Sequence, residues 1–229
     1  MSDATTQINQ NPADYLQPGV FVDSDHPRVV EFALSHRVDG EEPLPAAIRM
    51  YLAVRDEIVY DPYQVGPDPS YFRASDCLVR GSGFCIPKAA LLAACARVIS
   101  IPARVGYADV RNHLSTKKLD ELTGGNVYTW HSYTDLFLEN HWVKATPAFN
   151  KSLCERFGVH VLEFDGRNDS LFQEFNQAGH RHMDYVRQRG VFDDVPYERI
   201  QDDFEKNHPK WLHHRKDLED LEFGHLAEK

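Results

Sequence analysis

Residues 80–107, RGSGFCIPKAALLAACARVISIPARVGY, place Cys85 between a glycine-bearing loop and a long apolar run. From Ile86 to about Val98, apolar and small residues cover most of a helical circumference, which predicts a buried, central helix. Pro87 is tolerated only in the first turn, so Cys85 is expected at the helix N-terminus. Free backbone N–H groups and the helix dipole favour a thiolate there and could hold an oxyanion. The sequence therefore predicts a nucleophilic thiol, and Gly81 and Gly83 are expected to let a substrate approach the backbone closely.

A thiol nucleophile needs a base, and His131 is the best placed histidine in the sequence. The runs NVYTWHSYTDLFL and HWVKATPAF are rich in β-formers and are separated by Glu139 and Asn140, which predicts a hairpin. A lone cysteine or strand histidine is usually an ordinary core residue. The order of loop, helix, strand and hairpin indicates an active site. The expected pairing places three residues of the first strand on the same face as three of the second: His131, Tyr133 and Asp135 with Thr146, Lys144 and Trp142.

Further elements must carry these residues. Asp25 as N-cap and Pro27 in the first turn predict a short helix, and PLPAAIRMYLAVRDEIVYD predicts a longer amphipathic one. Pro102 ends the cysteine helix, and ARVGYADV reads as a strand. After Asn150 the pattern weakens to turn residues and short helical pieces. The tail from about Pro196 is strongly charged, and it either docks on a partner or folds back on its own domain. Its main apolar residues are Trp211, Leu212, Leu218 and Leu221.

Composition narrows the function further. The 229 residues, 42% of them hydrophobic, predict one domain over 1–229, with a core at about 45–150, a loose N-terminus over 1–20 and an extension over 151–229. Lys plus Arg is 25 and Asp plus Glu is 35, so the net charge of −10 argues against nucleic acid as a partner. Neither a signal peptide nor a membrane-length apolar run is evident, so we expect a cytoplasmic protein without a membrane partner.

The cysteines and histidines do not suggest a metal centre. Cys77, Cys85, Cys95 and Cys154 form no CxxC pair, which argues against structural zinc and against disulfides. The histidines of the HRH run at 180–182 and the pair at 213–214 lack a third ligand at a known spacing. We therefore expect these histidines on a solvated surface, and we expect neither a metal nor a cofactor.

Two segments carry a resemblance to the transglutaminase-like superfamily of cysteine enzymes. GSGFCIPKAALLAACARVISIPARVGY is similar to that family's G-x-C motif, helix and "GIPAR" strand, and HSYTDLFLENHWVKATP is similar to its H-x-W-x-E…W-V…D-P hairpin. The resemblance implies an α+β fold: a papain-like or transglutaminase-like core with a cysteine-bearing helix on an antiparallel sheet, and extra N- and C-terminal helical segments. It also implies a Cys-His-Asp triad, in which the matching motifs assign the cysteine to Cys85 and the histidine to His131.

The third position departs from the family pattern. Counting from Trp142, the family's aspartate falls on Thr146, whose hydroxyl can accept a hydrogen bond from an imidazole but carries no charge. Asp135 aligns with the family's in-strand acid, but the expected register sets it opposite Lys144 and favours a cross-strand ion pair. Asn150 is the other candidate, since an asparagine orients the histidine in papain-like enzymes. The third role therefore stays open among these residues, with Thr146 placed first.

The hypothesis is a cysteine enzyme that acts on amide bonds, peptide or isopeptide, through a thioester acyl-enzyme, with hydrolysis favoured over amine transfer. Its substrate would be a peptide or a small amide. Two alternatives remain: an acyltransferase like the arylamine N-acetyltransferases, since RGSGFC is similar to their Arg-Gly-Gly-x-Cys, and a non-catalytic binding module of the same fold. Alkylation by iodoacetamide distinguishes them, because a catalytic Cys85 should react much faster than the other three cysteines.

Overall fold

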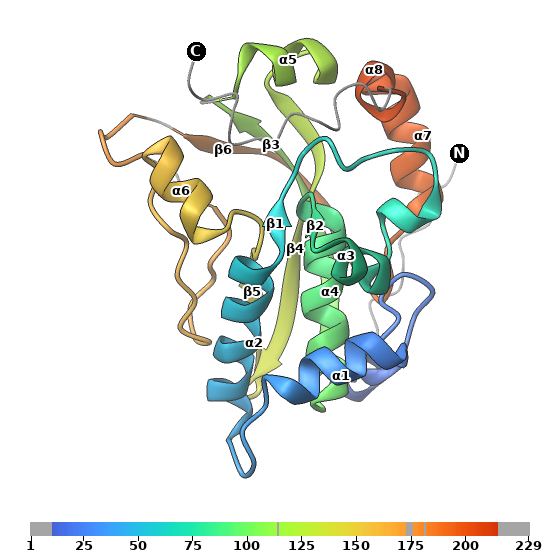
Figure 1. The fold of residues 1–229 in the computed structure, drawn as a ribbon, viewed down its shortest axis with the longest axis vertical. Helices are drawn as coiled ribbons and strands as arrows, with labels where there is room; N and C mark the ends of the chain where they lie inside the picture. Colours follow the sequence, from blue (N-terminus) through green and yellow to red (C-terminus); the bar gives the residue numbers. More distant parts are fainter. Residues whose placement is uncertain (1–10, 114, 173–175, 181, 215–229) are drawn as a thin grey trace.

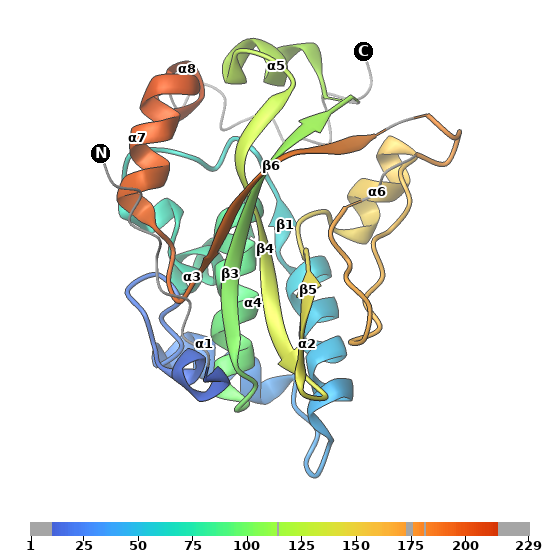
Figure 2. The same cartoon turned by 180° about the vertical axis from the view of Figure 1, so that it is seen from behind.

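The computed structural model describes residues 11–113, 115–172, 176–180 and 182–214. At its centre, helix α4 (Cys85–Val98) packs against a four-stranded antiparallel sheet (Figure 1). The strand order is β5-β4-β3-β6, and Figure 2 shows the sheet in front of α4. The strands are β3 (Ala103–Asn112), β4 (Val127–Leu138), β5 (His141–Ala145) and β6 (Met183–Phe192). The predicted α+β architecture, a cysteine-bearing helix on an antiparallel sheet, is confirmed.

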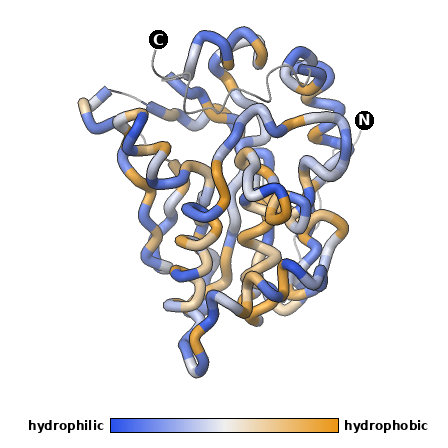
Figure 3. The backbone as a smooth tube through the Cα atoms, viewed as in Figure 1, coloured by the Kyte–Doolittle hydropathy of each residue, from blue (hydrophilic) through white to orange (hydrophobic). Residues whose placement is uncertain are grey.

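Helix α4 is buried on all sides from Cys85 to Arg97, as its all-round apolar pattern predicts. In Figure 3 much of the tube along this helix is orange. Its one lysine is fully buried: the Lys88 Nζ donates to the carbonyl oxygens of Arg55, at 3.0 Å, and Ile58. These carbonyls lie at the C-terminal end of α2 (Pro43–Glu57), where helix carbonyls lack an intrahelical partner. Lys88 thus ties the end of α2 to the first turn of α4.

The predicted hairpin and its register are also confirmed. Asp135 lies opposite Lys144, and the turn residues Glu139 and Asn140 both have positive φ, 45° and 67°. Two successive left-handed residues form the tight turn that matches the twist of two paired strands. Pairing of β4 with β5 ends at Thr134 and Ala145, so within the described residues no strand pairs with the preceding part of β4 on that side. This free edge of β4 lies beside the N-terminus of α4.

Shorter elements surround this core. They are η1 (Pro12–Leu16), α1 (Pro27–Ser35), β1 (Val59–Tyr60), η2 (Pro69–Tyr71), α3 (Ala74–Arg80), β2 (Ser82–Gly83), α5 (Lys117–Thr123), α6 (Lys151–Phe157), α7 (Tyr197–Asn207) and α8 (Pro209–Leu212). Strands β1 and β2 form a separate parallel pair. Helix α1 is capped by His26, whose ring accepts from the Arg28 N–H, and not by Asp25 as the sequence suggested.

The structure also decides three expectations for the segments before and after this core. The weakly patterned region after Asn150 contains β6, which pairs with β3 along its whole length. The described part of the predicted loose N-terminus is packed, because Tyr15 is buried with its ring edge against Trp142. The segment from Pro196 folds back: Trp211 is buried and its Nε1 donates to the carbonyl of Pro62. Leu218 and Leu221 lie outside the described residues.

Candidate active site

Cys85 is the first residue of α4, and the short loop that precedes it is fixed by its glycines. Gly81 ends α3 in the left-handed conformation, with φ of 68°, where its N–H closes the helix. A Cβ on Gly83 would lie 2.8 Å from the Cys77 Sγ and 3.0 Å from the Pro87 ring. The structure therefore assigns both glycines to the path of the loop, whereas the sequence suggested that they make room for substrate.

Cys85 is 9% exposed, and nearby backbone N–H groups act on the pKa of its thiol. Burial raises its pKa to about 11, against the opposing effect of the N–H groups of Ser132, Ile86 and Cys85 itself. Desolvation of the thiolate thus outweighs the helix terminus, which the sequence alone suggested would favour ionisation. At neutral pH the resting site holds a thiol.

His131 reaches the same place from the sheet. It lies on the part of β4 whose edge β5 leaves free, and it directly precedes Ser132, whose N–H faces the Cys85 thiol. Burial lowers the pKa of His131 to about 4, with a further contribution from the charge of His182 when that residue is protonated. The imidazole is therefore neutral at pH 7 and able to accept a proton. The residue next to His131 in β4 therefore acts on the Cys85 thiol through its N–H, and the pairing of the two side chains as nucleophile and base stays a prediction.

Thr146 and His131 line one small cavity of about 10 Å³, closed by apolar side chains that include Met183. The Nε2 of His131 and the Oγ1 of Thr146 are both enclosed and both lack a hydrogen-bond partner. A cavity of roughly 10–15 Å³ with polar walls has room for one water molecule. The residue at the position that carries an aspartate in the family motif thus lines the same cavity as His131.

Asp135 is held elsewhere. One of its oxygens accepts from the Arg104 guanidinium, at 2.8 and 2.9 Å, and that guanidinium lies 3.9 Å from the ring centroid of Trp142. Lys144 stands opposite Asp135 in the register, but its ammonium pairs with Asp169 instead. The expected ion pair between Asp135 and Lys144 is therefore wrong. Arg104 belongs to the IPAR motif, so three motif residues form one structural cluster beside the site.

Both polar atoms of the Asn150 side chain make hydrogen bonds outside the catalytic group. Its Oδ1 accepts from the Tyr60 N–H at 3.1 Å, and its Nδ2 donates to the Ser152 hydroxyl at 2.7 Å. Tyr60 pairs with Gly83 in the β1–β2 ribbon and packs edge-on against Phe149. Asn150 therefore fixes the strand beside the cysteine loop. A cavity of about 440 Å³ opens there, lined in part by Tyr60, Ser82 and Asn150.

His182 belongs to the site, and the sequence did not indicate it. It was expected on a solvated surface with its neighbours, but it is 3% exposed and stacks on Phe149, with ring centroids 6.1 Å apart. Burial lowers its pKa to about 4. His180 is exposed, as expected, and His213 pairs with Glu205 at the surface. In the part of the chain that the structure describes, no three potential metal-binding side chains gather, and no helix is long and apolar enough to cross a bilayer.

Comparisons with known proteins show the family and the fold of the chain. A model of the transglutaminase-like superfamily matches residues 32–147, just over half of the chain. The chain belongs to the transglutaminase-like superfamily. It is also similar to a crystal structure from Cytophaga hutchinsonii described as a "putative cysteine protease", with a TM-score of 0.50 and 15% identity. That match covers 85% of this chain and 51% of the other, so this chain spans about half the length of its structural neighbour. A comparison with curated proteins found no match.

Proposed function

We propose that this member of the transglutaminase-like superfamily is a cysteine hydrolase that cleaves amide bonds of peptides or small amides through a thioester acyl-enzyme. The observation that carries the proposal is the meeting of two elements. The Cys85 thiol, at the N-terminus of α4, faces the N–H of Ser132, and His131 is the preceding residue of β4. Membership of the superfamily supports an enzyme of this type.

In the first step, His131 takes the proton of the Cys85 thiol as the sulfur attacks the carbonyl carbon of the scissile amide. The carbonyl oxygen becomes an oxyanion. The N–H of Cys85 and a second N–H, proposed to be that of Ser132, donate hydrogen bonds to it. When the tetrahedral intermediate collapses, His131 gives its proton to the leaving amine, and a thioester on Cys85 remains. Because thiol and imidazole are both neutral at rest, this proton transfer belongs to the substrate complex.

In the second step, His131 takes a proton from a water molecule as the water oxygen attacks the thioester carbon. The acid product leaves, and the proton returns to the Cys85 sulfur. An amine in place of water would give a transamidation product by the same route. Hydrolysis is the proposed outcome, by analogy within the family.

Thr146 is proposed as the third member of the catalytic group, with a positioning role. Its hydroxyl and the His131 Nε2 face the same cavity without other partners. One water molecule in that cavity would accept from the Nε2–H and bridge it to the hydroxyl. The imidazole would then keep its other nitrogen free to act as the base.

A second function is favoured by one observation. Burial raises the pKa of Cys85 and lowers that of His131, and Thr146 offers no negative charge to a protonated imidazole. A resting site of this kind also fits a non-catalytic binding module of the same fold.

The four cysteines are free thiols, which supports the proposal that the protein works in the reducing environment of the cytoplasm.

Hydrolysis of p-nitrophenyl acetate and of a mixed peptide library tests the proposal. The wild-type protein should release p-nitrophenol in a burst that Cys85→Ala removes, while its far-ultraviolet circular dichroism is kept. Cys154→Ala, which removes another buried thiol, is the matched control and should keep the burst. A burst that persists in Cys85→Ala would overturn the assignment of the nucleophile, and a folded wild-type protein with no burst would favour the binding module.

A further inference from the structure

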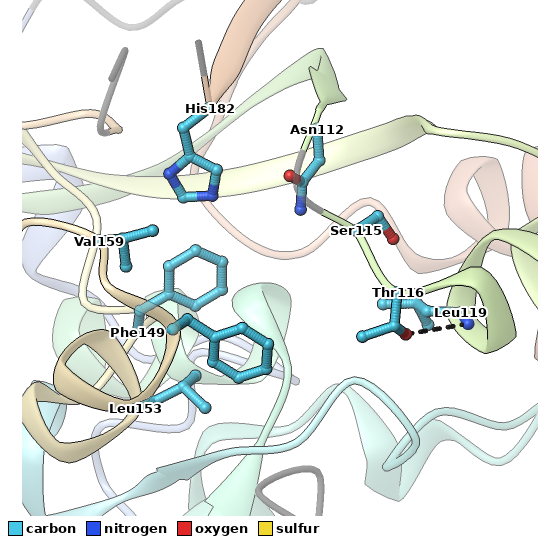
Figure 4. Close-up of a pocket in the computed structure, with 9 residues that line it drawn as sticks. Asn112, Ser115, Thr116, Leu119, Phe149, Leu153, Val159 and His182 are labelled. Carbon is cyan, nitrogen blue, oxygen red and sulfur yellow. Dashed lines mark hydrogen bonds between the residues drawn. The ribbon is translucent and has the colours of Figure 1, made fainter. Parts of the chain in front are cut away.

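A third cavity, of about 40 Å³, adjoins the site and has no role in the chemistry described above. Figure 4 shows it between α6 and the loop that leads to α5, with His182 above and Phe149 and Leu153 below. At roughly 10–15 Å³ for each water molecule, it has room for about three. That space suits a branched alkyl group of three or four carbons.

The pocket neighbours two other cavities and shares one wall residue with each. Phe149 lines both this pocket and the small cavity that holds His131 and Thr146. Leu153 lines both this pocket and the larger cavity at the cysteine loop. The larger cavity is lined by Ser82 of the cysteine loop and by Tyr60, which interacts with Cys85, so a substrate bound there would have the pocket beside it.

The side chains that line this pocket favour uncharged ligand groups. Most of the described lining is apolar, contributed by Leu119, Phe149, Leu153, Phe157 and Val159, and none of the described lining residues is an acid, a lysine or an arginine. Placing a charged group there would cost its desolvation without a partner of opposite charge. The pocket thus excludes acidic and basic side chains.

One polar group is built into the roof of the pocket. The His182 Nδ1 is enclosed and has no hydrogen-bond partner. Because an enclosed N–H without an acceptor is rarer in proteins than an enclosed lone pair, the hydrogen of the neutral ring belongs on Nε2. Figure 4 shows the ring reaching over the pocket with one nitrogen directed to the side where Asn112 lies. The pocket therefore presents an N–H donor above an apolar floor.

We propose that this pocket binds the acyl side of the substrate, as an uncharged, branched alkyl side chain, and that a second carbonyl oxygen on that side, apart from the scissile one, accepts from His182. This inference rests on the proposed function for the reaction, but binding alone can test it. The substrate class would be peptides or small amides with a valine- or leucine-sized group on the acyl side of the scissile bond.

The test measures binding of 3-methylbutanamide and acetamide to the Cys85→Ala protein by ligand-observed NMR titration. The branched amide should bind at least tenfold more tightly, since it adds three carbons for the apolar floor. Leu153→Trp and Leu119→Phe, which fill the pocket, should each remove that preference. N-acetyl-leucinamide, whose acetyl carbonyl is separate from the scissile amide, should bind about tenfold more weakly when His182→Phe is added to the Cys85→Ala protein. Leu34→Trp, the same type of change at an exposed position of α1, is the matched control and should keep the preference.

Equal affinities for the two amides, or a preference that both pocket variants retain, would overturn the inference. Should the pocket variants fail to fold, nuclear Overhauser effects between the ligand methyl groups and the ring protons of Phe149 and Phe157 decide the question in the wild-type protein. Their presence supports the pocket, and their absence in the bound complex contradicts it. Reaction with p-nitrophenyl 3-methylbutanoate is a separate readout: no burst with either this ester or the acetate refutes the proposed function, while the binding data still decide the pocket.

Discussion

Acidification should destabilise this protein through His131 and His182. Both are buried as neutral imidazoles, with pKa values lowered from 6.5 to about 4. The unfolded chain takes up a proton on each ring as the pH falls through 6.5, but the folded chain does so only near pH 4. Over this interval the unfolded state binds more protons, so the free energy of unfolding decreases as the pH decreases. Stability from these groups is complete above about pH 6.5 and is lost towards pH 4.

The magnitude follows from the two shifts. A displacement of about 2.5 pKa units corresponds to about 3 kcal/mol for each histidine at 1.36 kcal/mol per unit. Two such groups give about 6 kcal/mol, which is comparable to the total stability of many domains. The repulsion between the two protonated rings is part of the His131 shift, so replacing His182 should also reduce the pH dependence that remains from His131.

Urea unfolding at several pH values between 7.5 and 4.5 measures the effect. The difference in unfolding free energy between wild type and His131→Gln should change by about 3 kcal/mol over this range, because the variant lacks the titrating group. Buried carboxylates such as Asp135 titrate in both proteins and cancel in the difference. His141→Gln, at an exposed position in the same hairpin, is the control. Parallel curves for wild type and His131→Gln would refute the conclusion that His131 is buried in its neutral form.

Three further predictions concern the site and its support. Thr146→Asp should raise turnover at least tenfold, since a charged third partner can contribute on the order of 10⁴ in rate. Thr146→Val should lower turnover about three- to tenfold, because it removes a neutral hydrogen bond. Steady-state kinetics that show no change in either variant would remove Thr146 from the catalytic group. Burial raises the pKa of Cys85 to about 11, so its alkylation by iodoacetamide should accelerate about tenfold per pH unit between pH 7 and 9. The rate should stay above that of the other cysteines. A rate that is constant across this range would indicate a preformed thiolate. Arg104→Met should destabilise the fold by about 3–5 kcal/mol, because it leaves the buried Asp135 carboxylate unpaired, and chemical denaturation that shows a loss below 1 kcal/mol would contradict this role.

The sequence predicted the elements whose pattern is local. Helix α4 is apolar all round, and Pro87 and Pro102 mark its limits, so its burial and its N-terminal cysteine followed directly. The β4–β5 hairpin was equally clear, since Glu139 and Asn140 suit a two-residue turn. The register of this hairpin in turn predicted that His131 and Thr146 lie on the same face of the sheet.

Strand β6 was missed because its side chains are largely exposed or half-buried, so it lacks the regular alternation of a half-buried strand. His182 was missed for the same reason: it becomes buried only because β6 joins β3 and carries the preceding residue to the site. The partner of Asp135 could not be chosen from the register alone, since Arg104 and Lys144 flank it on the two neighbouring strands. The resting charge of Cys85 depends on the balance of burial against backbone N–H groups, which only the packed structure determines.

The central claim is that Cys85 forms a covalent acyl-enzyme with the help of His131. Intact-protein mass spectrometry tests this after p-nitrophenyl acetate is added and the reaction is quenched rapidly with acid. We predict one acetyl group per chain, located on Cys85 by peptide mapping, absent in Cys85→Ala and formed at least a hundredfold more slowly in His131→Ala. An unmodified wild-type protein, an acetyl group on another cysteine, or equal acylation rates in wild type and His131→Ala would contradict it.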